Sequence, residues 1–170
     1  MTDLEIRVLS KRDLDPFWKL RLRALAEEPE CFGASSDEFL ERPMSDIAQQ
    51  LRNSSESFVI GAFERGLVGM VGFYRRQGLK LHHKGTICSM YVAPEARGKG
   101  IARALMNAAI ARATKLSDME ELLLTVVTNN EAARKLYLSL GFETYGIEKE
   151  ALKLGGRLFD EEMMRLKLKN

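Results

Sequence analysis

The feature that most constrains this chain is a glycine-rich turn between a strand-like run and a helix-like run. The turn, Arg97-Gly-Lys-Gly-Ile-Ala102, follows the apolar run Thr86–Val92 and opens a helical pattern over Ile101–Lys115. Glycine adopts backbone dihedrals that are closed to other residues, and the first turn of a helix has free N–H groups at the positive end of its dipole. Strand, turn and helix therefore predict a phosphate-binding site. Arg97 and Lys99 add positive charge to it.

Hydrophobic periodicity and turn signals predict a mixed α/β sheet flanked by helices, in the order β-α-α-β-β-β-α-β-α-β-β. The predicted strands are residues 4–9, 58–63, 67–74, 86–92, 122–127, 142–152 and 158–168. The predicted helices run from the capping signal at residues 10–13 to Pro29, and over about residues 45–51, 101–115 and 130–140. The 170 residues suit one domain.

Composition argues against several classes of partner. The chain has 26 Lys and Arg residues against 24 Asp and Glu residues, so its net charge is only +2. This net charge is too small to indicate a nucleic-acid-binding protein. The apolar stretches are too short for a membrane span. Cys31 and Cys88 are far apart and are expected to be reduced thiols in a cytoplasmic protein. His82 and His83 are adjacent, so they would point to opposite faces of a strand, and no metal site is expected.

Two common phosphate fingerprints fail at the glycine turn. A Walker loop requires glycine where Ala93 stands and Ser or Thr where Gly100 stands. The dinucleotide fingerprint requires a small residue in place of Arg103. These mismatches disfavour nucleoside triphosphates and nicotinamide cofactors.

The remaining pattern resembles the GNAT superfamily of N-acetyltransferases. Residues 97–102 fit each fixed position of its Gln/Arg-x-x-Gly-x-Gly/Ala motif, and the segment 90–94 resembles the strand and proline that precede it. Downstream, residues 130–142 reproduce the family pattern Asn-x-x-Ala-x-x-Leu-Tyr-x-x-x-Gly-Phe. The resemblance implies a single GNAT-like N-acetyltransferase domain over residues 1–170. Its acceptor-side part would be residues 4–57 and its acyl-CoA-binding core residues 58–168.

The resemblance also implies acetyl-CoA as cosubstrate, with direct attack by an amine in a ternary complex. Backbone amides at the helix start would bind the pyrophosphate. Amides of a strand that splays from its neighbour after a bulge would bind the pantetheine arm and polarise the thioester carbonyl. The implied cofactor-binding residues are Met90, Tyr91, Val92, Arg97, Gly98, Lys99, Gly100, Ile101, Ala102, Arg103, Asn130 and Tyr137.

Two residues of the second motif carry side-chain roles by this resemblance. Asn130 would bond the pantetheine, or cap its helix, or do both. Tyr137 would act as the general acid that protonates the departing CoA thiolate.

The general base is not fixed by the sequence. Some relatives place a Glu on the strand where this chain has Thr125, which cannot serve. Ser89 could orient a water, and Glu28 or Glu30 could approach from the acceptor side. Deprotonation of the amine through water is equally compatible with the residues present.

The sequence does not identify the amine acceptor either. Residues 27–41 contain six acidic residues, no basic one, and Phe32 and Phe39. They could form a cleft for a cationic amine, on a small molecule or a protein N-terminus, or a solvated loop with two aromatic anchors. A non-catalytic acyl-CoA sensor and a longer acyl donor are alternatives. A homodimer through the terminal strands around Phe159 and Met164 is a further expectation.

Overall fold

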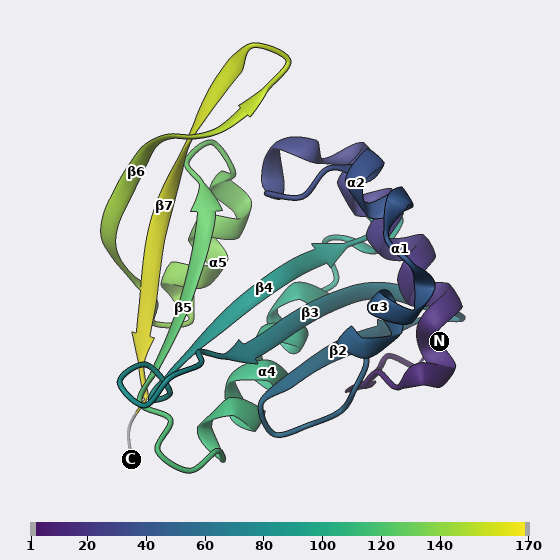
Figure 1. Ribbon diagram of the computed structural model, residues 1–170, viewed down its shortest axis with the longest axis horizontal. Helices are drawn as coiled ribbons and strands as arrows, with labels where there is room; N and C mark the ends of the chain where they lie inside the picture. The colour runs from purple at the N-terminus through teal and green to yellow at the C-terminus, as the bar shows by residue number, and fades with distance from the viewer. Residues whose placement is uncertain (1–2, 169–170) are drawn as a thin grey trace.

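Seven strands form one sheet in the order β1-β2-β3-β4-β5-β7-β6, with helices on both of its faces (Figure 1). This computed structural model describes residues 3–168, so the outermost two residues at each end of the expected 1–170 domain lie outside it. The strands are β1 Glu5–Val8, β2 Ser57–Phe63, β3 Leu67–Arg75, β4 Lys84–Val92, β5 Glu121–Val127, β6 Glu143–Leu154 and β7 Arg157–Lys167. The helices are α1 Leu14–Glu27, α2 Ser36–Glu41, α3 Met44–Gln50, α4 Ile101–Thr114 and α5 Glu131–Ser139. Short 3-10 turns are η1 Lys11–Asp13, η2 Pro29–Cys31 and η3 Pro94–Ala96.

The predicted fold class and the order of its elements are confirmed, with one addition. Helix α2 lies in the acidic segment, for which the sequence predicts a cleft wall or a solvated loop. A capping box starts it, because the Ser35 hydroxyl accepts from the Glu38 N–H and the Glu38 carboxylate accepts from the Ser35 N–H. This Ser-x-x-Glu spacing was a signal available in the sequence.

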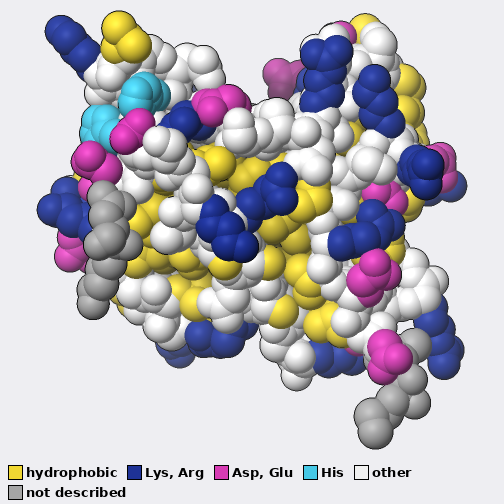
Figure 2. Space-filling model, turned by 90° about the horizontal axis from the view of Figure 1, so that it is seen from below, with side chains coloured by type: hydrophobic (Ala, Val, Ile, Leu, Met, Phe, Trp, Pro, Cys, Tyr) yellow, Lys and Arg dark blue, Asp and Glu magenta, His cyan; other side chains and the backbone are white. Residues whose placement is uncertain are grey.

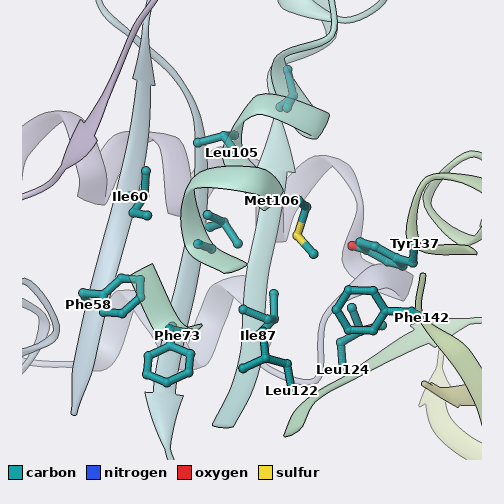
Figure 3. Packing of buried hydrophobic residues seen from close by; sticks show 14 of the residues in the cluster. Phe58, Ile60, Phe73, Ile87, Leu105, Met106, Leu122, Leu124, Tyr137 and Phe142 are labelled. Atoms are coloured by element: carbon teal, nitrogen blue, oxygen red, sulfur yellow. The ribbon is translucent and has the colours of Figure 1, made fainter. Parts of the chain in front are cut away.

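Each face of the sheet carries its own hydrophobic core. Helices α1 to α3 cover one face, where Phe17 and Ile47 are buried, and α4 and α5 cover the other, where Leu105 is buried. Helix α4 lies close to β3 because Gly69 faces it: a Cβ there would come within 3.0 Å of Leu105 Cδ1. Figure 3 shows the α4 and α5 side, where Leu105 packs over the strands.

The sheet opens in its middle. Among the described strands, β4 and β5 are the one parallel pair, and their pairing runs only from Lys84↔Glu121 to Thr86↔Leu123. Beyond that point β4 stays on β3 while β5 stays on β7. The two halves of the sheet therefore diverge toward the end of β4 that leads into the glycine turn, as Figure 1 shows.

The expected dimer through the terminal strands stays a prediction, and Phe159 and Met164 themselves lie inside the sheet. Met164 is completely buried and Phe159 is 9% exposed, because β7 lies between β5 and β6 rather than at the sheet edge. The free edge on this side of the sheet is β6.

Surface charge is mixed on the face seen in Figure 2, where Lys and Arg alternate with Asp and Glu around the rim. Within residues 3–168 no helix is long and apolar enough to cross a membrane.

Candidate functional site

A cleft of about 760 Å³ lies where β4 and β5 diverge. Its walls are the second half of β4, the glycine turn, β5 and α5. The turn η2 contacts both β5 and β6, so it spans the opening from the side of α1. Apart from Lys99 and the base candidate Glu30, the cleft brings together the predicted site residues, including Glu28, Ser89, Arg97, Asn130 and Tyr137, from segments far apart in the sequence.

The glycine turn presents a row of free backbone donors to this cleft. Gly98 and Gly100 have φ values of 76° and 80°, and Gly100 is the N-cap of α4. The first helical bond runs from the Ala104 N–H to the Gly100 carbonyl, at 3.0 Å. The N–H groups of residues 98–103 have no acceptor in the described part of the chain. A Cβ at either glycine would meet no atom within 4 Å, so the space over these donors is open and fits a pyrophosphate.

The cationic side chains of the turn are already engaged. Arg97 donates from Nε to the Val92 carbonyl at 2.9 Å and from Nη2 to Glu28 at 2.6 Å. The Lys99 ammonium lies 3.0 Å from Glu64, and Arg103 donates to the Ser139 hydroxyl at 2.7 Å. Arg97 and Lys99 are therefore paired with carboxylates, whereas Arg103, bound to a neutral hydroxyl, keeps its charge beside the free backbone donors.

A bulge in β4 sets the direction of the next row of donors. Ser89 has a φ of 54°, and the β3–β4 register shifts there. The Ala93 N–H donates to Val68 of β3 at 2.8 Å. Because N–H directions alternate along a strand, the Met90 and Val92 amides face the opposite side, from which β5 has diverged. The splayed strand implied by the resemblance is present in the structure, and it directs two of the three named amides into the cleft.

Asn130 caps α5, because its Oδ1 accepts from the Ala133 N–H at 3.2 Å. Its Nδ2 lies 3.7 Å from the sulfur of Cys31 in η2. The helix-capping role expected as an alternative is therefore real, and the amide nitrogen still faces the cleft wall.

Tyr137 is 6% exposed and packs edge-on against Phe142, with ring centroids 6.0 Å apart. Figure 3 shows its hydroxyl pointing away from Phe142, toward the part of the core where Met106 lies. Burial, and secondarily the nearby Cys31, raises the pKa of the phenol well above its usual value. The hydroxyl therefore holds its proton throughout the physiological pH range, as a proton donor must. Cys31 also stays neutral, because burial and the carboxylates of Glu28 and Glu30 raise its pKa to about 11.

The candidates for the general base differ in their position and in whether another side chain already binds them. Glu28 lines the cleft but is bound to Arg97, Ser89 lines it at the bulge, and Glu30 is not part of its wall. Thr125 is exposed on β5 and carries no ionisable group. Glu161 of β7 lines the cleft too, and burial together with the Glu148 carboxylate raises its pKa. Sequence reasoning missed Glu161, because no motif marks it and only strand pairing brings it here.

Three of the six carboxylates in the acidic segment are already engaged. Glu27 accepts from Arg23 at 2.9 Å and from the Tyr91 hydroxyl at 3.1 Å, while Glu28 binds Arg97. Glu38 is used by the α2 capping box. Of the two aromatic residues, Phe39 is buried in the core beneath α1, stacked on Trp18, and only Phe32 lines the cleft.

The sequence and the structure of this chain are similar to those of known acetyltransferases. The family model described as "Acetyltransferase (GNAT) family" matches residues 20–142. A spermidine N(1)-acetyltransferase from Vibrio cholerae is 29% identical over 112 residues, which cover 66% of this chain and 63% of that relative. A ribosomal-protein-alanine N-acetyltransferase from Brucella melitensis superposes with a TM-score of 0.83 at 26% identity, over 96% of this chain and 99% of the other. The structure of yncA from Salmonella typhimurium with its cofactor acetyl-CoA gives a TM-score of 0.80 at 22% identity, over 99% and 96%.

Proposed function

The chain belongs to the acetyltransferase (GNAT) family, and on this premise we propose that it moves the acetyl group of acetyl-CoA to a primary amine, by direct attack in a ternary complex. The observation that carries the proposal is the meeting of two features in one cleft. A row of unpaired amide donors at residues 98–103 faces it from one side, and Tyr137, whose phenol stays protonated, lines it from another.

The donor half of the reaction depends on backbone groups. Acetyl-CoA supplies an activated acetyl thioester and a diphosphate. The amides of residues 98–103 would bind the diphosphate at the start of α4, where the helix dipole favours negative charge. The Met90 and Val92 amides, left free by the divergence of β5, would bind the pantetheine arm and the thioester carbonyl oxygen. Arg97 would position these groups rather than neutralise phosphate, since it binds the Val92 carbonyl.

Tyr137 would hold the proton that the departing sulfur takes. The phenol carries its proton at neutral pH, as a general acid requires, and burial makes it a weaker acid than an exposed tyrosine, so it would give the proton up only as negative charge develops on the sulfur. The Asn130 amide nitrogen, next to Cys31, would help to orient the pantetheine arm from the end of β5.

An amine with a pKa near 10 must lose a proton before it attacks. Glu28, Ser89 acting through water, and Glu161 all line the cleft and could accept that proton or relay it. Glu161 has the advantage that it forms no ion pair with any other described residue. A cytoplasmic location, which the two free thiols favour, is part of the same proposal.

The test is an acceptor screen with acetyl-CoA, in which thiol release is followed against a blank without amine. The blank is needed because Cys31 and Cys88 are themselves free thiols. We expect amine-dependent release together with saturable acetyl-CoA binding. Tight acetyl-CoA binding without release across a broad amine panel would instead favour a non-catalytic acyl-CoA sensor. A preference for longer acyl thioesters would keep the reaction class and change the donor.

A further inference from the structure

Arg21 of α1 is a guanidinium without an anionic partner at the edge of the cleft. It lines the main cleft and also a second cavity of about 270 Å³. Its Cζ lies 4.9 Å from the ring centroid of Phe32, yet its Nη1 is buried with no hydrogen-bond partner. It forms no salt bridge with any residue between 3 and 168. A partly buried charge without a hydrogen-bond partner or a counter-charge destabilises the fold, unless an anionic ligand binds it.

The groups around Arg21 do not neutralise it. Arg42 lines the same small cavity and adds positive charge there. The Cys88 thiol stays protonated, because burial raises its pKa. Glu38 is the one carboxylate on this cavity wall within the described range, and it is held by Ser35 at 3.0 and 3.1 Å. In the main cleft Glu28 is paired with Arg97.

The place of Arg21 connects it with the reacting end of the cleft. The two cavities share Arg21, Tyr74, Cys88 and Ser89 in their walls. Ser89 is the bulge residue directly before Met90, whose amide faces the cleft. A molecule bound to Arg21 therefore extends along β4 toward the position proposed for the thioester. It approaches from the α1 side, opposite to the Tyr137 side.

We propose that Arg21 binds the carboxylate of the amine acceptor, so that the acceptor is a small amino acid rather than a polyamine. This inference rests on the proposed acetyltransferase function and specifies its substrate class. The planar guanidinium is suited to a carboxylate because it can donate two parallel N–H bonds to the two oxygens. An excess of arginines at this end would repel a polycationic acceptor.

The first test needs no variant. Amino acids, their carboxamides, the amines that lack the carboxyl group, and spermidine are compared as acceptors. Binding of each to the CoA-loaded protein is measured by calorimetry, so that the test stands even without turnover. We expect kcat/KM for an amino acid to exceed that of its carboxamide by about tenfold to a hundredfold, with the same order in affinity. Equal values, or a preference for spermidine, would overturn the inference and leave the acetyltransferase function intact.

The second test uses Arg21→Gln, Arg21→Lys and the control Lys19→Gln, which lies on the exposed side of α1. Arg21→Gln should raise KM for amino acids about tenfold or more, with little change for carboxamides. Arg21→Lys should recover part of the loss, and Lys19→Gln should behave as the wild type. The acetyl-CoA Kd and circular dichroism show whether each variant is folded. Loss of acetyl-CoA affinity in folded Arg21→Gln would assign Arg21 to the donor instead.

Discussion

At the scale of single residues, Tyr137 combines two properties that are seldom found together, a buried ring and a hydroxyl without a partner in the described chain. Tyr137→Phe removes only the oxygen and keeps the packing against Phe142. We expect kcat to fall about a hundredfold, because general acid catalysis contributes on this order, while the acetyl-CoA Kd stays within about twofold. Steady-state kinetics and calorimetry measure the two quantities. An unchanged kcat would remove Tyr137 from the mechanism.

Two carboxylates compete for the role of general base. We expect Glu161→Gln to lower kcat/KM about tenfold or more at neutral pH, since a positioned base supplies that much. Glu28→Gln should have the smaller effect on the pH profile, because its carboxylate is committed to Arg97. pH–rate profiles of both variants decide between them. If neither variant alters the acid limb of the profile, the proton leaves through water.

The Asp13–Arg7 pair ties the start of α1 to β1. Asp13 accepts two bonds of 2.9 Å from Arg7 and one of 2.8 Å from the Ser10 N–H. Asp13→Asn should lower the free energy of unfolding by about 1–2 kcal/mol at pH 7. Asp15→Asn, in an exposed pair with Lys19, should cost less than about 0.5 kcal/mol.

The pH dependence of this pair follows from the direction of the pKa shift. Arg7, and then the Ser10 N–H, lowers the pKa of Asp13 in the folded state. The pair is therefore fully stabilising above the usual aspartate pKa, and its contribution is lost as pH falls through the lower, folded value. Urea unfolding at several pH values should show the wild-type advantage over Asp13→Asn constant from pH 5 to 8 and shrinking below about pH 4. An advantage that persisted at pH 2 would contradict this origin.

Individual residues were the hardest part to predict from the sequence. Asn130 and Tyr137 could be named because a motif with fixed spacing marks them. Arg21 could not, because an arginine on an amphipathic helix usually faces water, and only the packing of α1 on the sheet shows that this one lies in the wall of the cleft. The engagement of Arg97 with Glu28 was equally hidden, since it joins residues 69 positions apart.

At the scale of elements, the start of α4 depends on the backbone conformation of Gly100. Gly100→Ala places a side chain at φ 80°, which costs about 1 kcal/mol, and projects a methyl group into the open space over the amide row. We expect the acetyl-CoA Kd to rise about tenfold or more, equivalent to about 1.4 kcal/mol. Gly156→Ala is the matched control, because Gly156 has a φ of 78° and lies in the β6–β7 turn. Equal Kd values for the two variants would contradict the phosphate role.

Most elements were predictable because each has a local cause. The alternation in β1, the glycine before α4 and the Gly155-Gly156 turn act over a few residues. Helix α2 was not predicted although its Ser35–Glu38 capping box is local, because six residues are too few to show a clear helical periodicity. The bulge at Ser89 has no local signal, since serine rarely adopts positive φ and only pairing with β3 imposes it.

At the scale of the whole molecule, acetyl-CoA would bind in the cleft between β4 and β5, where the two halves of the sheet diverge. Its contacts with both halves would link them. Acetyl-CoA at a hundred times its Kd should raise the free energy of unfolding by about 2.7 kcal/mol. Hydrogen exchange should slow at residues 90–92 and 98–103, and also at the start of α5. Slowing confined to the glycine turn would mean that the ligand contacts only one half. Denaturant titration and exchange mass spectrometry measure the two effects.

The amide row of the glycine turn has a consequence for how the sequence can vary. A main-chain N–H is supplied by every residue except proline, so the exposed Lys99 can be exchanged for many others without removing a hydrogen-bond donor. The acceptor end relies instead on the side chains of a few residues such as Arg21. Substitutions at non-glycine positions of the turn therefore leave coenzyme binding largely unchanged. Substitutions at the acceptor end change which amine is bound. A chain built in this way can acquire a new substrate by changing one or two side chains while keeping its coenzyme.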